Sequence, residues 1–234
     1  MGMTILDLVR QAKERPAQTV GEKSLVTLEA FLSGIFDGLE ALGKSTDERG
    51  GERFDFWLAK QNRLPISKDL FSTLTLITPN DSVAFDLFFE KIGEFLEQRL
   101  GPTIWSFDLP CDGVPRSESD LDLSPLLLHL KKQPYPLLRG KSLRLLVAYL
   151  NGHFLCRTAV FGEVQCMPRM DQFGIWLQSG FSTIHDHAPY QWHRILMYIS
   201  DRREQESGAF DLFFNLYEKW ERGEAAKDAI AAVG

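Results

Sequence analysis

The densest group of side chains that could do chemistry is a histidine-rich segment in the second half of the chain. His185, Asp186 and His187 are consecutive, and His193 follows shortly after them. Two imidazoles at i and i+2 can bind a divalent metal, with His193 or Asp186 as a further ligand. No other ligand at a standard spacing completes the shell, and Pro189 follows directly. The pattern is therefore more typical of a polar surface loop ahead of a helix, and we predict no metal and no cofactor.

A second arrangement groups His153 with the His185-Asp186 dipeptide and with Asp201 or Asp211. This order loosely resembles the H…HD…D pattern of helical HD-domain phosphohydrolases. The ligands of that family hold a divalent metal for phosphate-ester cleavage. The resemblance implies a metal-dependent phosphohydrolase, which we keep as an alternative activity.

The cysteines give little sign of nucleophilic chemistry. His153 lies three residues before Cys156 and could act as its base on a helix, but Cys156 is close to an apolar run, which favours a buried thiol. The motifs of serine hydrolases, nucleotide-binding loops, zinc proteases and EF-hands are absent from the sequence. We therefore predict no catalytic residues. An odd number of cysteines without zinc spacing, and no signal peptide, indicate a cytoplasmic protein.

Charge excludes one class of partner and suggests another. The net charge is −6, and no lysine- or arginine-rich run provides the basic surface of a nucleic-acid-binding protein. No apolar run is long enough to span a membrane. Residues 101–124 hold one basic and five acidic side chains, which would attract a basic protein surface. The five acids are Asp108, Asp112, Glu118, Asp120 and Asp122.

The sequence repeats itself. Residues 23–34 read KSLVTLEAFLSG and residues 141–152 read KSLRLLVAYLNG, with seven of twelve positions identical at an offset of 118. The segment AFDLFF occurs at 84–89 and again at 209–214, at an offset of 125. Four matched blocks in the same order predict two copies of one unit, at residues 1–100 and 125–234. Residues 101–124, with three prolines, form the predicted linker.

Apolar spacing predicts that each copy is helical. The pattern i, i+3, i+4, i+7 predicts helices at 4–14, 22–42 and 54–62. Residues 69–78 contain strand-favouring Thr and Ile, but their counterpart 191–200 resembles a helix, so we predict helices for both. A phenylalanine stripe predicts the last helix of each copy, and we expect Asp81 or Ser82 to cap the first of these helices.

The recurring pattern is a helix ending L-x-x-F/Y-L-x-G, then F-x-x-W-L, then A-F-D-x-F-F. It loosely resembles small helical bacterial immunity proteins of polymorphic-toxin systems. The residues that support this are Leu28, Phe31, Leu32, Gly34, Phe54, Trp57, Leu58 and 84–89, with their second-copy partners. The resemblance implies a cytoplasmic protein that neutralises a toxin. It locates no binding residue, because the matched positions are of core type.

We therefore predict an all-α fold of two tandem helical repeats packed as a pseudo-twofold pair. The predicted function is protein binding by an immunity protein that occludes a toxin's basic active-site cleft, with a non-enzymatic adaptor as a further alternative. The predicted binding residues are the five linker acids and four side chains where the second copy departs from the first. These four are Asp186, His187, Tyr190 and Gln191.

Overall fold

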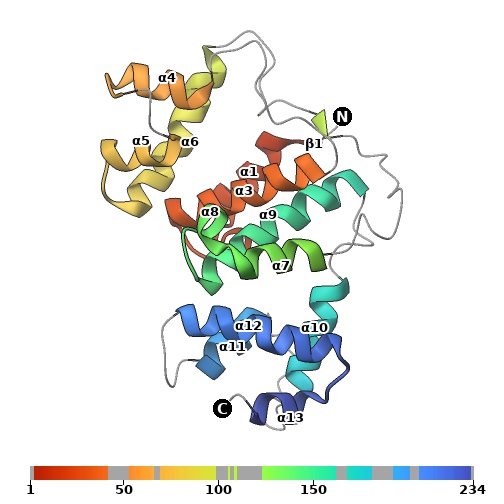
Figure 1. Cartoon of the computed structure of the whole chain (residues 1–234). Coiled ribbons are helices and arrows are strands. Elements are labelled where there is room, and N and C mark those ends of the chain that lie inside the picture. The colour runs from red at the N-terminus through yellow and green to blue at the C-terminus, as the bar shows by residue number, and fades with distance from the viewer. Residues whose placement is uncertain are drawn as a thin grey trace. The chain divides into compact units, whose positions relative to one another are not determined.

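The computed structural model describes residues 3–41, 53–65, 69–98, 105, 108–109, 123–161, 168–180, 192–200 and 206–232 (Figure 1). Within these ranges the protein is helical, as predicted. The exception is one two-residue antiparallel pair of β1 (Met3–Thr4) with β2 (Asp108–Leu109). No helix in the same ranges has the length and apolar character needed to cross a bilayer.

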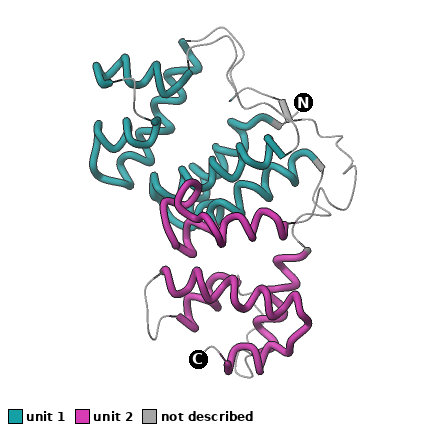
Figure 2. The backbone as a smooth tube through the Cα atoms, viewed as in Figure 1, with its two compact units in different colours: residues 1–113, 148–162 teal, residues 114–147, 163–234 magenta. Residues whose placement is uncertain are grey.

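Contacts divide the chain into two compact units (Figure 2). Unit 1 contains residues 1–113 and 148–162, and unit 2 contains residues 114–147 and 163–234. The long helix α9 (Leu143–Phe161) contributes to both. The units differ from the predicted repeats because 148–162 belongs to unit 1, and the repeat boundaries stay a prediction.

The described residues of unit 1 form six helices in addition to its part of α9, and the helix predicted at 69–78 is confirmed as α5. The helices are α1 (Ile5–Glu14), α2 (Pro16–Thr19), α3 (Leu25–Ala41), α4 (Phe54–Gln61), α5 (Leu70–Ile77) and α6 (Asp81–Glu97). Their apolar stripes meet in an aromatic core. Phe54 packs edge-on against Phe88, with ring centroids 5.9 Å apart, and Trp105 packs against both. Trp105 is buried and thereby anchors the chain that follows α6.

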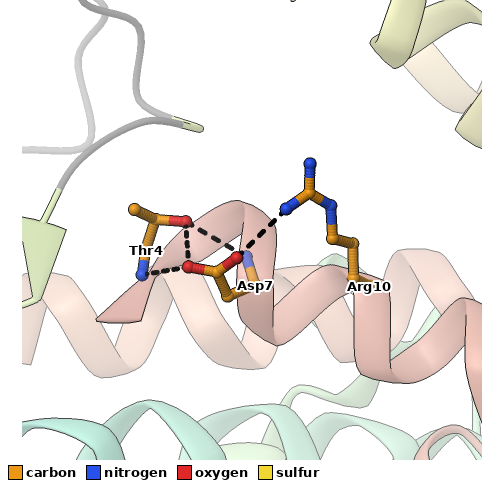
Figure 3. A network of polar contacts seen from close by, with 3 residues as sticks. All are labelled: Thr4, Asp7 and Arg10. Carbon is orange, nitrogen blue, oxygen red and sulfur yellow. Dashed lines mark hydrogen bonds and ion pairs between the residues drawn. The ribbon is translucent and has the colours of Figure 1, made fainter. Parts of the chain in front are cut away.

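Helix α1 begins with a reciprocal cap (Figure 3). The Asp7 backbone N–H donates to Thr4 Oγ1 at 3.2 Å, and the Thr4 backbone N–H donates to Asp7 Oδ2 at 2.9 Å. Asp7 also accepts from Arg10 Nη1 at 3.2 Å. These bonds satisfy backbone N–H groups that have no partner inside the helix. The negative charge of Asp7 is also favourable there, because the N-terminus of a helix carries a partial positive charge.

The predicted cap of α6 is wrong by one residue. Asn80 is the N-cap, and its side chain accepts from the Val83 N–H at 3.0 Å. Asp81 instead accepts from the Leu25 N–H, at the start of α3, at 3.1 Å. Asp81 thus satisfies a helix-end donor on a distant segment, which local sequence patterns cannot show.

In unit 2, the part of the chain that the structure describes forms six further helices. They are α7 (Ser124–Lys132), α8 (Pro134–Leu138), α10 (Pro168–Ser179), α11 (Trp192–Ser200), α12 (Glu206–Glu221) and α13 (Ala226–Ala231). Phe173 of α10 and Phe213 of α12 are fully buried and pack edge-on, with centroids 5.7 Å apart. An edge-on phenylalanine pair therefore joins α4 to α6 in unit 1 and α10 to α12 in unit 2.

Within unit 1, helices α3 and α9 approach each other at two glycines. A Cβ on Gly34 would lie 2.0 Å from the Tyr149 carbonyl oxygen, and a Cβ on Gly152 would lie 2.0 Å from the Phe31 carbonyl oxygen. Any larger residue would force the two backbones apart. This contact places Tyr149 and His153 of α9 beside the C-terminal half of α3.

Candidate functional site

Most of the predicted binding residues lie outside the described ranges. This applies to Asp112, Glu118, Asp120 and Asp122 of the linker, and to Asp186, His187, Tyr190 and Gln191. Asp108 is described only as backbone, paired with Thr4 in the short β-pair. These nine residues stay predictions.

The predicted metal ligands are described only in part. His185 and His187 fall outside the described ranges, whereas His193 lies in α11 with its ring perpendicular to that of Trp192. Desolvation, and next the charge of Arg194, lower the pKa of His193 to about 4. Among the described residues, no three His, Cys, Asp or Glu side chains gather closely enough to hold a metal ion.

A polar stripe on α9 is the first arrangement in the described residues that could do chemistry. Tyr149, His153 and Arg157 follow at intervals of four, so they share one face of the helix. The Tyr149 hydroxyl donates to Asp37 of α3 at 2.6 Å, and Arg157 Nη1 lies 3.4 Å from His153 Nε2. Desolvation by burial, followed by the Asp37 hydrogen bond and charge, raises the Tyr149 pKa.

Burial keeps this stripe away from substrates. His153 is 4% exposed, and desolvation followed by the nearby Arg157 charge lowers its pKa to about 4. Cys156 is fully buried, as predicted, and its Sγ lies 3.4 Å from the position of a Cβ on Gly38. A nucleophile must reach its substrate. Because the Cys156 thiol and the His153 imidazole are buried between α3 and α9, they do not form an open active site.

The second arrangement is a groove in unit 2 between α7 and α12, with a cavity volume of about 410 Å³. Its floor is apolar and is formed by Leu127, Leu128, Phe214 and Tyr217. Leu128 is 50% exposed, so it forms the outer part of this apolar lining. A cavity of this size with apolar walls suits one or two large apolar groups of a ligand.

Charged side chains of both signs surround the floor. Lys131 Nζ donates to Glu218 Oε1, Arg169 pairs with Glu221, and Arg222 pairs with Glu224 at 3.0 Å. Lys131 and Glu218 keep about half of their side-chain area exposed. The rim therefore consists of neutralised but accessible ion pairs, which can exchange partners with an incoming charged surface.

Two residues that line the groove are identical at the matched positions in the first half of the chain, but the contacts of the lysine differ. Lys13 matches Lys131 at the offset of 118, and Phe89 matches Phe214 at the offset of 125. Lys13 Nζ lies over the Phe89 ring, 5.7 Å from its centroid, whereas in the described part of the chain Lys131 makes no such ring contact. Gly93 is the residue that matches Glu218, so the first copy lacks the acid that binds the second lysine.

Leu128 is also a departure from the first copy, because its matched residue is Arg10. Arg10 points along the surface to Asp7, in the polar network of Figure 3. The changes from Arg10 to Leu128 and from Gly93 to Glu218 can be read from the sequence, where they are two of many differences between these matched segments. The sequence prediction sought departures only in the loop near the histidines and missed these two.

Comparison of the chain with protein-family profiles, with curated protein sequences and with solved structures gave no significant match.

Proposed function

We propose that this protein is a non-enzymatic binding module that neutralises a protein partner, and concretely an immunity protein for a bacterial toxin. The observation that carries the proposal is the α7–α12 groove, which combines an apolar floor with an accessible rim of both charges. This is the composition of a protein-binding surface: a desolvated apolar centre and a polar edge.

Inhibition would be steric. The groove would anchor apolar side chains of the toxin, while the acids of residues 101–124 would meet a basic active-site cleft and speed the encounter. Cytoplasmic location, and the lack of a cofactor, of a nucleic-acid ligand and of membrane attachment, belong to the same proposal.

The proposal includes a duplicated module with a pseudo-twofold relation. Matched contacts support it. Lys23 pairs with Asp86 at 2.6 Å, and their matched residues Lys141 and Asp211 pair at 2.9 Å. The reciprocal glycine contacts of α3 and α9 join matched positions too, because Gly34 matches Gly152 and Phe31 matches Tyr149.

The experiment is a protection assay. The toxin encoded beside this protein is expressed in bacteria with and without the full chain, and survival is counted. We expect survival to depend on the protein and on direct binding of the purified pair.

Binding without turnover separates this function from the phosphohydrolase. A tightly bound metal that is lost when His185 and His187 are both changed to Ala would favour the enzyme instead. If neither binding nor metal is found, the adaptor is the better interpretation.

A further inference from the structure

Arg157 of α9 is a buried charge that has no acidic partner in the part of the chain that the structure describes. The residue is 6% exposed, and its Nε atom has no hydrogen-bond partner. Its Nη1 lies 3.4 Å from His153 Nε2, while Asp37 of the neighbouring α3 accepts from the Tyr149 hydroxyl instead. A guanidinium keeps its proton in proteins, and a buried charge without a counter-charge lowers the stability of a fold. An anion at this guanidinium would therefore stabilise the folded chain.

Packing alone does not account for the polar groups on this face of α9. His153 and Arg157 match Ile35 and Leu39 of α3 at the offset of 118, and both of these apolar residues are buried. Apolar side chains of similar volume in place of buried charged groups are often neutral or stabilising. Since α3 fills the matched positions with apolar side chains, the guanidinium and the imidazole indicate a ligand rather than a requirement of the core.

His153 fixes one side of the guanidinium. Arginine has only donors, so His153 Nε2 is the acceptor of the Arg157 Nη1 contact. The ring is neutral at pH 7, because desolvation and next the Arg157 charge lower its pKa to about 4. The contact leaves the edge formed by the Nε and Nη2 donors, whose two parallel N–H groups match a pair of oxygens on a carboxylate or phosphate.

We infer that Arg157 binds a small oxyanion through its Nε edge, in a site that His153 orients. The ligand class is a phosphate or carboxylate group on a free small molecule. Its role is structural, because it neutralises a charge inside unit 1. An ion of this kind needs no open path for turnover, so the burial that excludes a catalytic role agrees with this one. The inference needs no protein partner and is independent of the proposed function.

The first test is a calorimetric titration of the full chain, dialysed into chloride buffer, with inorganic phosphate and separately with acetate. We expect one of these two probes to bind with a dissociation constant on the order of 1 mM, and the preferred probe distinguishes a phosphate ligand from a carboxylate ligand. Arg157→Met should bind that probe at least about tenfold more weakly. Arg157→Lys keeps the charge without the paired donors and should also bind more weakly than the wild type.

Arg10→Met is the matched control, because it removes an exposed arginine from the same unit, and it should bind as the wild type does. Circular dichroism verifies that each variant is folded. Binding of neither probe, or equal binding by Arg157→Met and wild type, would overturn the inference. Equal binding by Arg157→Lys and wild type would show that the paired donors of the Nε edge are not used.

The second test separates a ligand site from a packing role. In chloride buffer, urea unfolding should show Arg157→Met at least as stable as the wild type, because the variant removes an uncompensated buried charge. The preferred probe should then raise the unfolding midpoint of wild type and of Arg10→Met more than that of Arg157→Met, since a ligand of the folded chain stabilises it. The general effect of the salt is common to all three proteins. A clear loss of stability for Arg157→Met in chloride, or the same rise for all three, would contradict the site.

Discussion

At the scale of single residues, the matched lysines Lys13 and Lys131 make different contacts of similar strength. An exposed cation–ring contact such as Lys13 over Phe89 contributes about 0.5–1 kcal/mol, and an exposed ion pair such as Lys131 with Glu218 contributes about 0.2–1 kcal/mol. Neither contact is therefore a large part of the stability of the fold.

Thr4 and Asp7 determine how the first helix responds to acid. Thr4→Ala should lower the free energy of unfolding by about 1 kcal/mol, because the Asp7 N–H loses its acceptor. Hydrogen bonds from Thr4, first its side chain and then its backbone, hold the Asp7 pKa below 3.8. A depressed carboxyl pKa stabilises the fold above the unfolded value and ceases to do so as the pH falls through the folded one. Urea unfolding at pH 7 and pH 3 should show a smaller loss on acidification for Asp7→Asn than for wild type.

His153 and His193 should both contribute to a second pH window. The pKa of each is about 4, below the ordinary histidine value of about 6.5, so the unfolded chain binds a proton at each ring that the folded chain does not. Stability is then fully present above pH 6.5 and falls as the pH drops toward 4, by up to about 1.4 kcal/mol per pH unit for each histidine.

The variant His153→Phe keeps a ring beside Tyr149 and removes the titrating group. Its free energy of unfolding, measured by urea between pH 7.5 and 4.5, should depend less steeply on pH than that of the wild type. His129→Gln removes an exposed imidazole from α7 and serves as the control. An identical slope for His153→Phe and wild type would show that the pKa of His153 is the same in the folded and the unfolded chain.

At the scale of elements, the close crossing of α3 and α9 requires glycine at positions 34 and 152. Gly34→Ala or Gly152→Ala places a methyl group 2.0 Å from a backbone carbonyl oxygen, so the helices must separate. We expect each to lower the free energy of unfolding by about 3 kcal/mol. Gly93→Ala is the matched control in α6, where the space is open, and should be neutral or stabilising by up to about 1 kcal/mol. Chemical unfolding of the three variants measures this; similar values for all three would contradict the close crossing.

The helices themselves could be predicted, because their apolar spacing is strong and local. α1, α3 and α4 begin and end within a few residues of the predicted ranges, and α5 is helical despite its strand-favouring residues. Burial on one side of α5, at Thr73 and Leu74, overrides that weak preference. The cap of α3 by Asp81 could not be predicted, since its donor and acceptor are far apart in sequence.

The groove could be predicted only in part. Its floor follows from the phenylalanine stripe, and the changes at positions 128 and 218 can be read from the repeat. Helices α7 and α12 lie together, and Lys131 bonds to Glu218. No local pattern predicts this packing, because the two helices are far apart in sequence. The buried stripe of α9 illustrates the opposite case: His153 and Cys156 had the spacing of a catalytic pair, but packing against α3 places both out of reach of a substrate.

At the scale of the whole molecule, the proposed duplication would provide two versions of each surface, of which only one has to retain the original residues. The pair Phe85–Phe89 and its match Phe210–Phe214 have similar centroid distances of 5.1 and 4.9 Å. The rings therefore pack alike at these matched positions, whereas Leu128 and Glu218 stand where the first half has Arg10 and Gly93.

The most direct measurement is a calorimetric titration of the full chain with the proposed partner, the product of the neighbouring gene. We expect nanomolar affinity for the wild type. Leu128→Arg, which gives α7 the residue of the first copy at an exposed position, should bind at least about tenfold more weakly. Asp211→Asn should bind as tightly as the wild type. Equal affinities of Leu128→Arg and wild type would contradict the central claim that the α7–α12 groove is the binding surface.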